Sequence, residues 1–232
     1  GECAQTGDAG ERARLHHATA ALMRPLRLAI SALLGYLLGT VPSADLAARL
    51  TAGGDVDLRE RGSRNPGGVN AFRVLGRHAG RAVIVADVAK GFAACACGRA
   101  AAGDLGAHVG GVAAVVGHCY PAWNRFRGGK GVATSFGQCL YTFPAAAPLD
   151  LTLALGVARV PGLRRPALVS TAVASTVWVG ASVVWWRRGF SNSWGPAPTR
   201  ALPLANAATA LVVASGFARA HRRGHPDDLE PA

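Results

Sequence analysis

Two runs rich in glycine, hydroxyl and basic residues carry the side chains best suited to binding an anion. The first is Gly62–Arg73, in which Ser63, Asn65 and Asn70 add hydrogen-bonding groups to glycines that let the backbone approach a ligand closely. Consecutive N–H groups can form an anion nest, and Arg73 can offer two parallel hydrogen bonds to a phosphate. A surface turn uses the same residue types but does not need two asparagines and flanking arginines. We therefore interpret this run as a phosphate-binding loop.

The second run, Gly117–Thr134, places Lys130 among glycines directly before an apolar stretch. A helix that begins there would offer free N–H groups and the positive end of its dipole to an anion, and Lys130 would add a point charge. The alternative is a basic loop beside a membrane span. The P-loop pattern G-x-x-x-x-G-K-[ST] is absent. His118 suits a general base, a phosphate ligand or an interfacial histidine, and the residues alone leave these readings open.

Long apolar stretches must position both runs. Half of the 232 residues are hydrophobic and 16% are charged, against about 25% in soluble domains. A membrane helix needs about 20 mostly apolar residues. Candidate spans occupy residues 26–50, 79–102, 105–123, 167–186 and 202–217, and the stretch 131–160 is divided at Pro144 and Pro148 into a short or re-entrant helix and a longer one. The sequence predicts an all-α integral membrane protein with about seven transmembrane helices.

The positive charge of the chain, formally +12, follows the connections between these spans. Lys and Arg are more frequent in the connections that lie inside if the N-terminus is outside, so we expect an outer N-terminus and a cytoplasmic C-terminus. Basic loops beside apolar spans also favour anionic lipid headgroups over nucleic acid as the partner. We expect no nucleic-acid binding.

The chain divides into three parts by composition. Residues 1–22 are polar and lack the apolar region of a signal peptide, so we interpret them as an extension that is disordered or a start-site artefact. Residues 23–224 form the membrane domain, and 225–232 a cytoplasmic tail. Within the second span, Asp87 and Lys90 are three residues apart and are expected to neutralise each other. Five cysteines without paired spacing predict neither a metal site nor a disulfide framework.

Taken together, the motifs resemble the PlsY family of bacterial acyl-phosphate:glycerol-3-phosphate acyltransferases. The resemblance covers nearly all of Met23–Arg223. It rests on Gly39–Pro42, Gly53–Arg59, Gly62–Arg73, Asp87–Gly91 and Gly117–Thr134, in this order.

This resemblance implies a seven-helix enzyme of the bacterial plasma membrane whose active site faces the cytoplasm. Such an enzyme transfers an acyl chain from acyl phosphate to the first hydroxyl of glycerol 3-phosphate, giving lysophosphatidic acid and phosphate. It needs no cofactor, and its partners are the two substrates, membrane lipids and an enzyme that supplies acyl phosphate. The expected catalytic residues are Ser63, Arg73, Lys130 and His221. The expected substrate-binding residues are Gly62, Asn65, Gly67, Asn70, His118, Gly128, Gly129, Gly131, Thr134 and Ser170.

Two departures bear on the expected activity. The family's G-A-T-N is Gly67–Asn70 here and lacks the threonine, and Gly224 stands where the family's third motif has asparagine. The second departure predicts weak binding of glycerol phosphate or a different acceptor. Two other functions stay open: a weak or silent relative that binds lipid or polyol phosphates, and a transporter of a phosphorylated anion. The transporter should show internal pseudo-symmetry, which we do not find.

Overall fold

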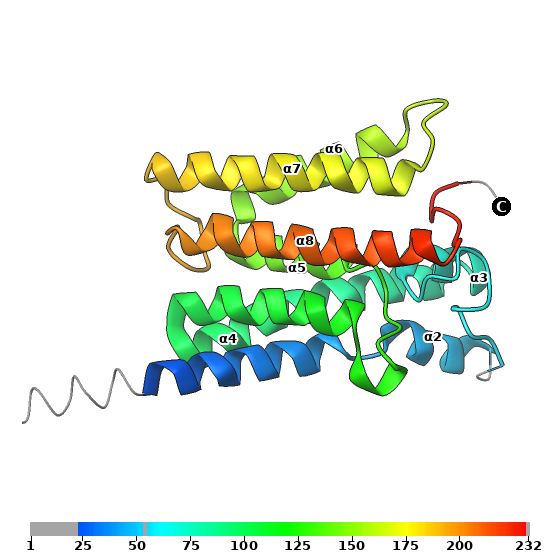
Figure 1. Cartoon of the computed structure of the whole chain (residues 1–232), viewed down its shortest axis with the longest axis horizontal. Helices are drawn as coiled ribbons and strands as arrows, with labels where there is room; N and C mark the ends of the chain where they lie inside the picture. The colour runs from blue at the N-terminus through cyan, green and yellow to red at the C-terminus, as the bar shows by residue number, and fades with distance from the viewer. Residues whose placement is uncertain (1–22, 53–54, 231–232) are drawn as a thin grey trace, which may run out of the picture.

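A computed structural model describes residues 23–52 and 55–230, and these form a bundle of long helices lying alongside one another (Figure 1). The predicted extension 1–22 lies outside the described residues. The helices are one over residues 23–39, α2 (Ser43–Ala52), α3 (Gly68–Val74), α4 (Arg77–Cys119), α5 (Val132–Thr142), α6 (Ala147–Ala158), α7 (Pro166–Arg187) and α8 (Ala201–Arg222), with 3-10 turns at Ala122–Asn124 and Pro144–Ala146. The described residues contain no strand, so the prediction of an all-α protein is confirmed.

The expected span 26–50 is two helices rather than one. The helix over residues 23–39 ends at a turn at Thr40, and α2 begins after Pro42, whose ring removes a backbone N–H and disfavours continuation of the helix. The small residues Ser43, Ala44, Ala47 and Ala48 form the buried face of α2. This break leaves α2 at the end of the bundle where the polar loops gather (Figure 1).

The predicted spans 79–102 and 105–123 correspond to the two arms of α4. Ala102 and Gly103 leave the helical conformation, and Gly103 has φ +67°, so the chain reverses there. Glycines let the arms pack closely: a Cβ atom on Gly98 would collide with the carbonyl oxygen of Gly106, and one on Gly110 with that of Ala94. The first arm can therefore lie directly against the second.

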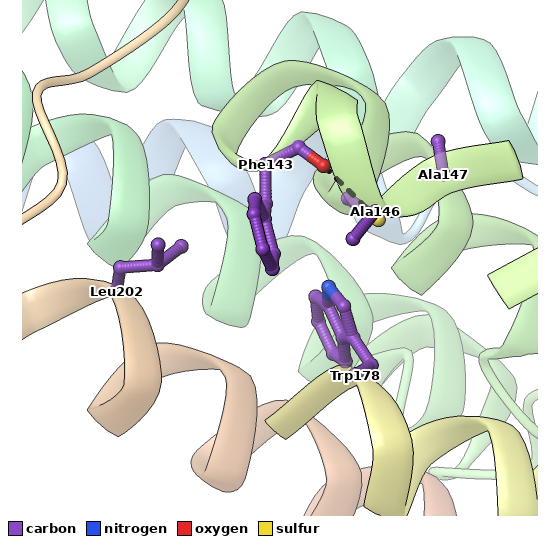
Figure 2. Packing of buried hydrophobic residues seen from close by; sticks show 6 residues of the cluster. Phe143, Ala146, Ala147, Trp178 and Leu202 are labelled. Carbon is purple, nitrogen blue, oxygen red and sulfur yellow. Dashed lines mark hydrogen bonds between the residues drawn. The ribbon is translucent and has the colours of Figure 1, made fainter. Parts of the chain in front are cut away.

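The stretch 131–160 is divided as predicted. Thr142 ends α5, Pro144 begins a 3-10 turn, and α6 follows with Pro148 in its first turn. Phe143, Ala147 and Leu202, near one end of α5, α6 and α8, pack with Trp178 from the middle of α7 (Figure 2). The cluster thus joins these four helices away from the polar loops.

Three described segments are long and apolar enough to cross a membrane. They are Met23–Ala52, Pro166–Arg187 and Ala201–Arg222, judged by length and composition. Many large apolar side chains on their surfaces are exposed, including Leu33, Val184, Leu204 and Leu211. Exposed apolar surface on long parallel helices is the arrangement expected of a protein solvated by lipid.

An ion pair is buried inside this bundle. Lys90 Nζ lies 2.8 Å from Asp87 Oδ1, so the expected neutralisation of the two charges is confirmed. Ser43 Oγ donates a hydrogen bond to Asp87 Oδ1 (2.9 Å), and Lys90 Nζ donates one to the carbonyl oxygen of Val41 (3.2 Å). The pair thus joins α4 to the break between the first two helices.

Removing one partner of this pair should destabilise the bundle. Asp87→Ala leaves the Lys90 ammonium buried without its counter-charge, and we expect a loss of about 3–5 kcal/mol. Thermal unfolding of the protein in detergent measures the effect. The double variant Asp87→Ala/Lys90→Met should recover most of the stability, because it buries no uncompensated charge. Equal destabilisation of the single and double variants would show that packing, rather than charge, holds this junction.

Candidate active site

The backbone of the first glycine-rich loop is fixed by hydrogen bonds to the side chain of Asn70. This side chain is fully buried: its Oδ1 accepts a hydrogen bond from Ser63 N (3.0 Å), and its Nδ2 donates to the carbonyl oxygens of Leu58 (2.9 Å) and Arg61 (3.0 Å). Gly62 has φ +57°, and a Cβ atom there would collide with Asn70 Oδ1. Asn70 therefore shapes the loop that presents Ser63.

Three donors that the sequence analysis selected converge on one carboxylate. Ser63 Oγ donates to Asp228 Oδ1 (2.5 Å), while Asn65 Nδ2 and Lys130 Nζ donate to Asp228 Oδ2 (both 2.9 Å). All four side chains are at least nine-tenths buried. We call Ser63, Asn65 and Lys130 the cradle. Its geometry suits a compact anion with several oxygens, and in this structure the tail carboxylate is that anion.

Lys130 is positioned by the second glycine-rich loop. Gly131, at φ +86°, precedes the first residue of α5. Arg219 Nη2 donates to the carbonyl oxygens of Gly128 (3.2 Å) and Gly129 (3.0 Å), which ties the loop to α8. Sequence reasoning missed Arg219, because it looked like one more basic residue at a helix end.

A basic cavity of about 350 Å³ opens on one side of the cradle. Its wall combines residues from both loops with the end of α8. The charged or titratable residues that line it are Arg59, Arg64, Arg127, Lys130, Arg219, Arg223 and His225. Asp45 pairs with Arg59 (2.7 Å) and Asp228 with Lys130, while Arg64, Arg127 and Arg223 form no ion pair within the described ranges 23–52 and 55–230. The cavity therefore favours an anionic ligand.

An apolar cavity of about 380 Å³ opens on the other side. It runs between α5, α6 and α7, with Val132, Leu151, Leu155 and Trp178 among its lining residues. Gly67, His118, Gly131 and Ser170 also line it, beside Asn65, Lys130 and Asp228 of the cradle region. Asn65 and Lys130 thus line both cavities.

Several residues that the sequence analysis placed in the site do not line either cavity. Arg73 on α3 and His221 on α8 are exposed and line neither cavity. Thr134 is buried against α4, where its carbonyl oxygen faces Gly91. Arg64, which the sequence analysis did not select, lines the basic cavity with φ +58°. Gly224 has φ +65°, and a Cβ atom there would meet open space.

His118 lies between the cradle and the buried ion pair. Its Nδ1 is 3.6 Å from Asp87 Oδ1, and its Nε2 faces Gly129, where a Cβ atom would collide with it. Glycine at position 129 is thus required by the close approach of the imidazole to the loop. The position fits a side chain that supports the loop and reaches the apolar cavity.

Charge in the basic cavity shifts the pKa values of two of its residues. Burial alone would lower the pKa of Arg59, but the hydrogen bonds and charges of Asp45 and Asp57 outweigh it and raise this pKa. Burial lowers the pKa of His225 below 6.5, and Arg64, Arg223, Lys130 and Arg219 lower it further. Burial and the neighbouring positive charges therefore disfavour the protonated form of His225, and an anionic ligand would offset the effect of the charges.

A helical bundle in which the cradle lies between a basic and an apolar cavity is an arrangement suited to amphiphilic anions. Residues 29–223 match the glycerol-3-phosphate acyltransferase family, and the chain belongs to that family. A glycerol-3-phosphate acyltransferase of Exiguobacterium sibiricum is 47% identical over 112 residues, which are 48% of this chain and 53% of that protein. One from Roseobacter denitrificans is 35% identical over 177 residues, or 70% of this chain and 88% of that protein.

The chain spans just over half the length of the first of these relatives. The fold is also similar to crystal structures of PlsY, an integral membrane glycerol 3-phosphate acyltransferase, in a glycerol 3-phosphate form and a lysophosphatidic acid form. Each has a TM-score of 0.66 and 25% identity, and covers 84% of this chain and 90% of the PlsY chain. The likeness supports an integral membrane protein with helical spans.

We expect His225 to be protonated when an anion binds in the basic cavity. Because surrounding cations depress its pKa, a bound anion raises that pKa, and affinity for the anion rises as the pH falls through this range. Calorimetry with sulfate at about pH 7.5 and about pH 5.5 should show roughly fivefold tighter binding at the lower pH, the effect of about 1 kcal/mol from one half-exposed charge. His225→Asn should remove this dependence. An unchanged dependence in the variant would place the titrating group elsewhere.

Proposed function

We propose that this chain transfers an acyl chain from acyl phosphate to the first hydroxyl of glycerol 3-phosphate, giving lysophosphatidic acid and phosphate for phospholipid synthesis. One observation carries the proposal: Lys130 and Asn65 line both a basic and an apolar cavity. A reaction that joins a hydrocarbon chain to a small phosphorylated alcohol needs both environments at one point. The family match and the PlsY structures support the same activity.

The two substrates fit the two cavities. The hydrocarbon chain of acyl phosphate lies in the apolar cavity, and its phosphate lies in the cradle of Ser63, Asn65 and Lys130. Glycerol 3-phosphate lies in the basic cavity with its phosphate among Arg64, Arg219 and their neighbours. The acyl carbon then lies beside the cradle, within reach of the acceptor hydroxyl.

The chemistry requires positioning and charge stabilisation. The hydroxyl oxygen attacks the acyl carbon and forms the ester bond, while the bond from that carbon to the phosphate oxygen breaks and the electron pair leaves with the phosphate. The hydroxyl proton passes to a phosphate oxygen. Lys130, Ser63 and Asn65 stabilise the charge on the departing phosphate. Arg73 and His221 keep their expected roles as predictions, although both lie outside the two cavities.

The proposed orientation puts both loops and the tail in the cytoplasm of a bacterial cell, where the phosphorylated substrates are made. Seven helical segments cross the membrane in this arrangement: the helix over residues 23–39, the two arms of α4, and α5 to α8. The N-terminus is then outside and the C-terminus inside. In Figure 1 the described C-terminal residues lie at the same end of the bundle as α2 and α3, which supports a single cytoplasmic site.

The tail belongs to this site as a competitor of the substrate phosphate. Asp227 Oδ1 and Oδ2 accept hydrogen bonds from Ala167 N (2.9 Å) and Leu168 N (3.1 Å) at the start of α7. This contact anchors the tail and aims Asp228 into the cradle. Acyl phosphate binds where the Asp228 carboxylate lies, so the carboxylate leaves as the phosphate arrives.

Lys130→Ala should lower kcat at least a hundredfold, because it removes the cation nearest the departing phosphate. The assay supplies acyl phosphate and labelled glycerol 3-phosphate to purified protein in detergent and measures labelled lysophosphatidic acid. Arg187→Ala, an exposed cation at the far end of α7, is the control and should keep its activity. If wild-type protein binds both substrates without turnover, it is a silent relative. Uptake of glycerol phosphate into vesicles without acylation would indicate a transporter.

Asp228→Asn should lower the KM for acyl phosphate about tenfold, because the competing charge is lost while the side chain keeps its shape. Glu230→Gln removes the same charge from the tail without touching the cradle, since Glu230 accepts a hydrogen bond from Arg165 N. It should stay within about twofold of wild type. A lower kcat with an unchanged KM in Asp228→Asn would instead make Asp228 a positioning residue for Lys130.

A further inference from the structure

We infer that Trp178 sets the longest acyl chain that this protein accepts, an inference that rests on the proposed function. The residues that line the apolar cavity change from polar to apolar along its length. Lys130 and Asn65 lie at the polar end, and Trp178 and Cys139 line the part formed by the later turns of α5 and α7. A chain whose phosphate lies in the cradle therefore points its methyl end at the indole.

The wall of the cavity along α7 is built from small residues until Trp178. Ser170, Ala174 and Trp178 all line it and follow one another at four-residue spacing, so they lie on one face of the helix. The first two leave room for a hydrocarbon chain beside the helix. Trp178 is the first large side chain on this face, two turns beyond Ser170.

Packing behind the ring prevents it from moving aside. Trp178 is 5% exposed and packs in the cluster with Phe143, Ala147 and Leu202 (Figure 2). Phe143 and Leu202 are themselves 1% and 0% exposed. Closely packed interiors have no vacant volume into which an indole can swing. The Trp178 indole is thus fixed in position. An acyl chain that is too long would collide with it.

The fixed indole should have a measurable effect on the preferred length of the acyl chain. Each methylene that the cavity buries improves binding about fourfold, the value of about 0.8 kcal/mol per CH₂. The gain should continue carbon by carbon until the methyl group reaches Trp178 and should reverse beyond that length. A series of acyl phosphates of increasing length should therefore show a sharp maximum of kcat/KM.

Two variants should move this maximum in opposite directions. Trp178→Ala removes the indole and should shift the preferred length upward by at least two carbons. Ala174→Leu fills the cavity one turn closer to the cradle and should shift it downward. Leu202→Ala is the matched control, because it loosens the same cluster without lining the cavity, and its length profile should stay that of wild type.

The outcomes separate this inference from the proposed function. No transfer by the wild-type protein with any acyl phosphate overturns the proposed function. Transfer with the same preferred length in wild type, Trp178→Ala and Ala174→Leu overturns the role of Trp178 alone. If Trp178→Ala does not fold, Trp178→Leu and Ala174→Leu still test the inference, since both keep an apolar side chain. Equal shifts in Trp178→Ala and Leu202→Ala would assign the effect to a loosened cluster and also overturn it.

Discussion

The candidate site depends on one buried ammonium group that lies between an apolar and a basic cavity. Lys130 is 6% exposed, and a charge with so little water around it requires other partners. It has two: the Asp228 carboxylate at 2.9 Å and the ring of Phe217, whose centroid lies 4.8 Å away. In the proposed function a substrate phosphate replaces the Asp228 carboxylate, while the Phe217 ring stays beside the ammonium group. A buried ammonium group in this position is stable only when an anion lies beside it.

Polar contacts from other parts of the molecule fix the loops that carry Lys130 and Ser63. Arg219 crosses from α8 to fix the glycine loop before Lys130, and Asn70 fixes the loop that carries Ser63. The buried pair of Asp87 and Lys90 joins α4 to the chain break after the first helix. The contacts of Arg219 and of the buried ion pair join segments distant in sequence, whereas those of Asn70 join α3 to the loop just before it. These contacts fix the backbone around the cradle, which lies beside the two cavities.

The sequence alone predicted the features that depend on local pattern. Apolar stretches and prolines indicated the spans and the divided pair α5 and α6, and Asp87 and Lys90 met because helix geometry brings together residues three apart. Ser63, Asn65 and Lys130 were found because such residue types among glycines are typical of anion sites. The family motifs added the substrate class, which spacing could not supply.

What the sequence did not predict depends on contacts between distant segments. Asp228 lies in an acidic tail with no distinguishing pattern, and only the fold brings it 98 residues back to Lys130. Arg219 and His225 acquire their positions from the packing of α8 against the second loop. Asn70 was expected to bind substrate, but the structure uses its amide for the loop backbone, a choice that depends on the turn at Gly62.

The short length of α6 affects the surrounding bilayer. With 12 residues it is about 18 Å long, whereas the hydrocarbon layer is about 30 Å thick. Most of its side chains are exposed or half-buried, so in the proposed orientation lipid would be its main neighbour. Hydrophobic mismatch draws the two leaflets together beside a short helix. The membrane next to α6 should be thinned there, so that lipid headgroups lie closer to the level of the cradle than they do elsewhere around the protein.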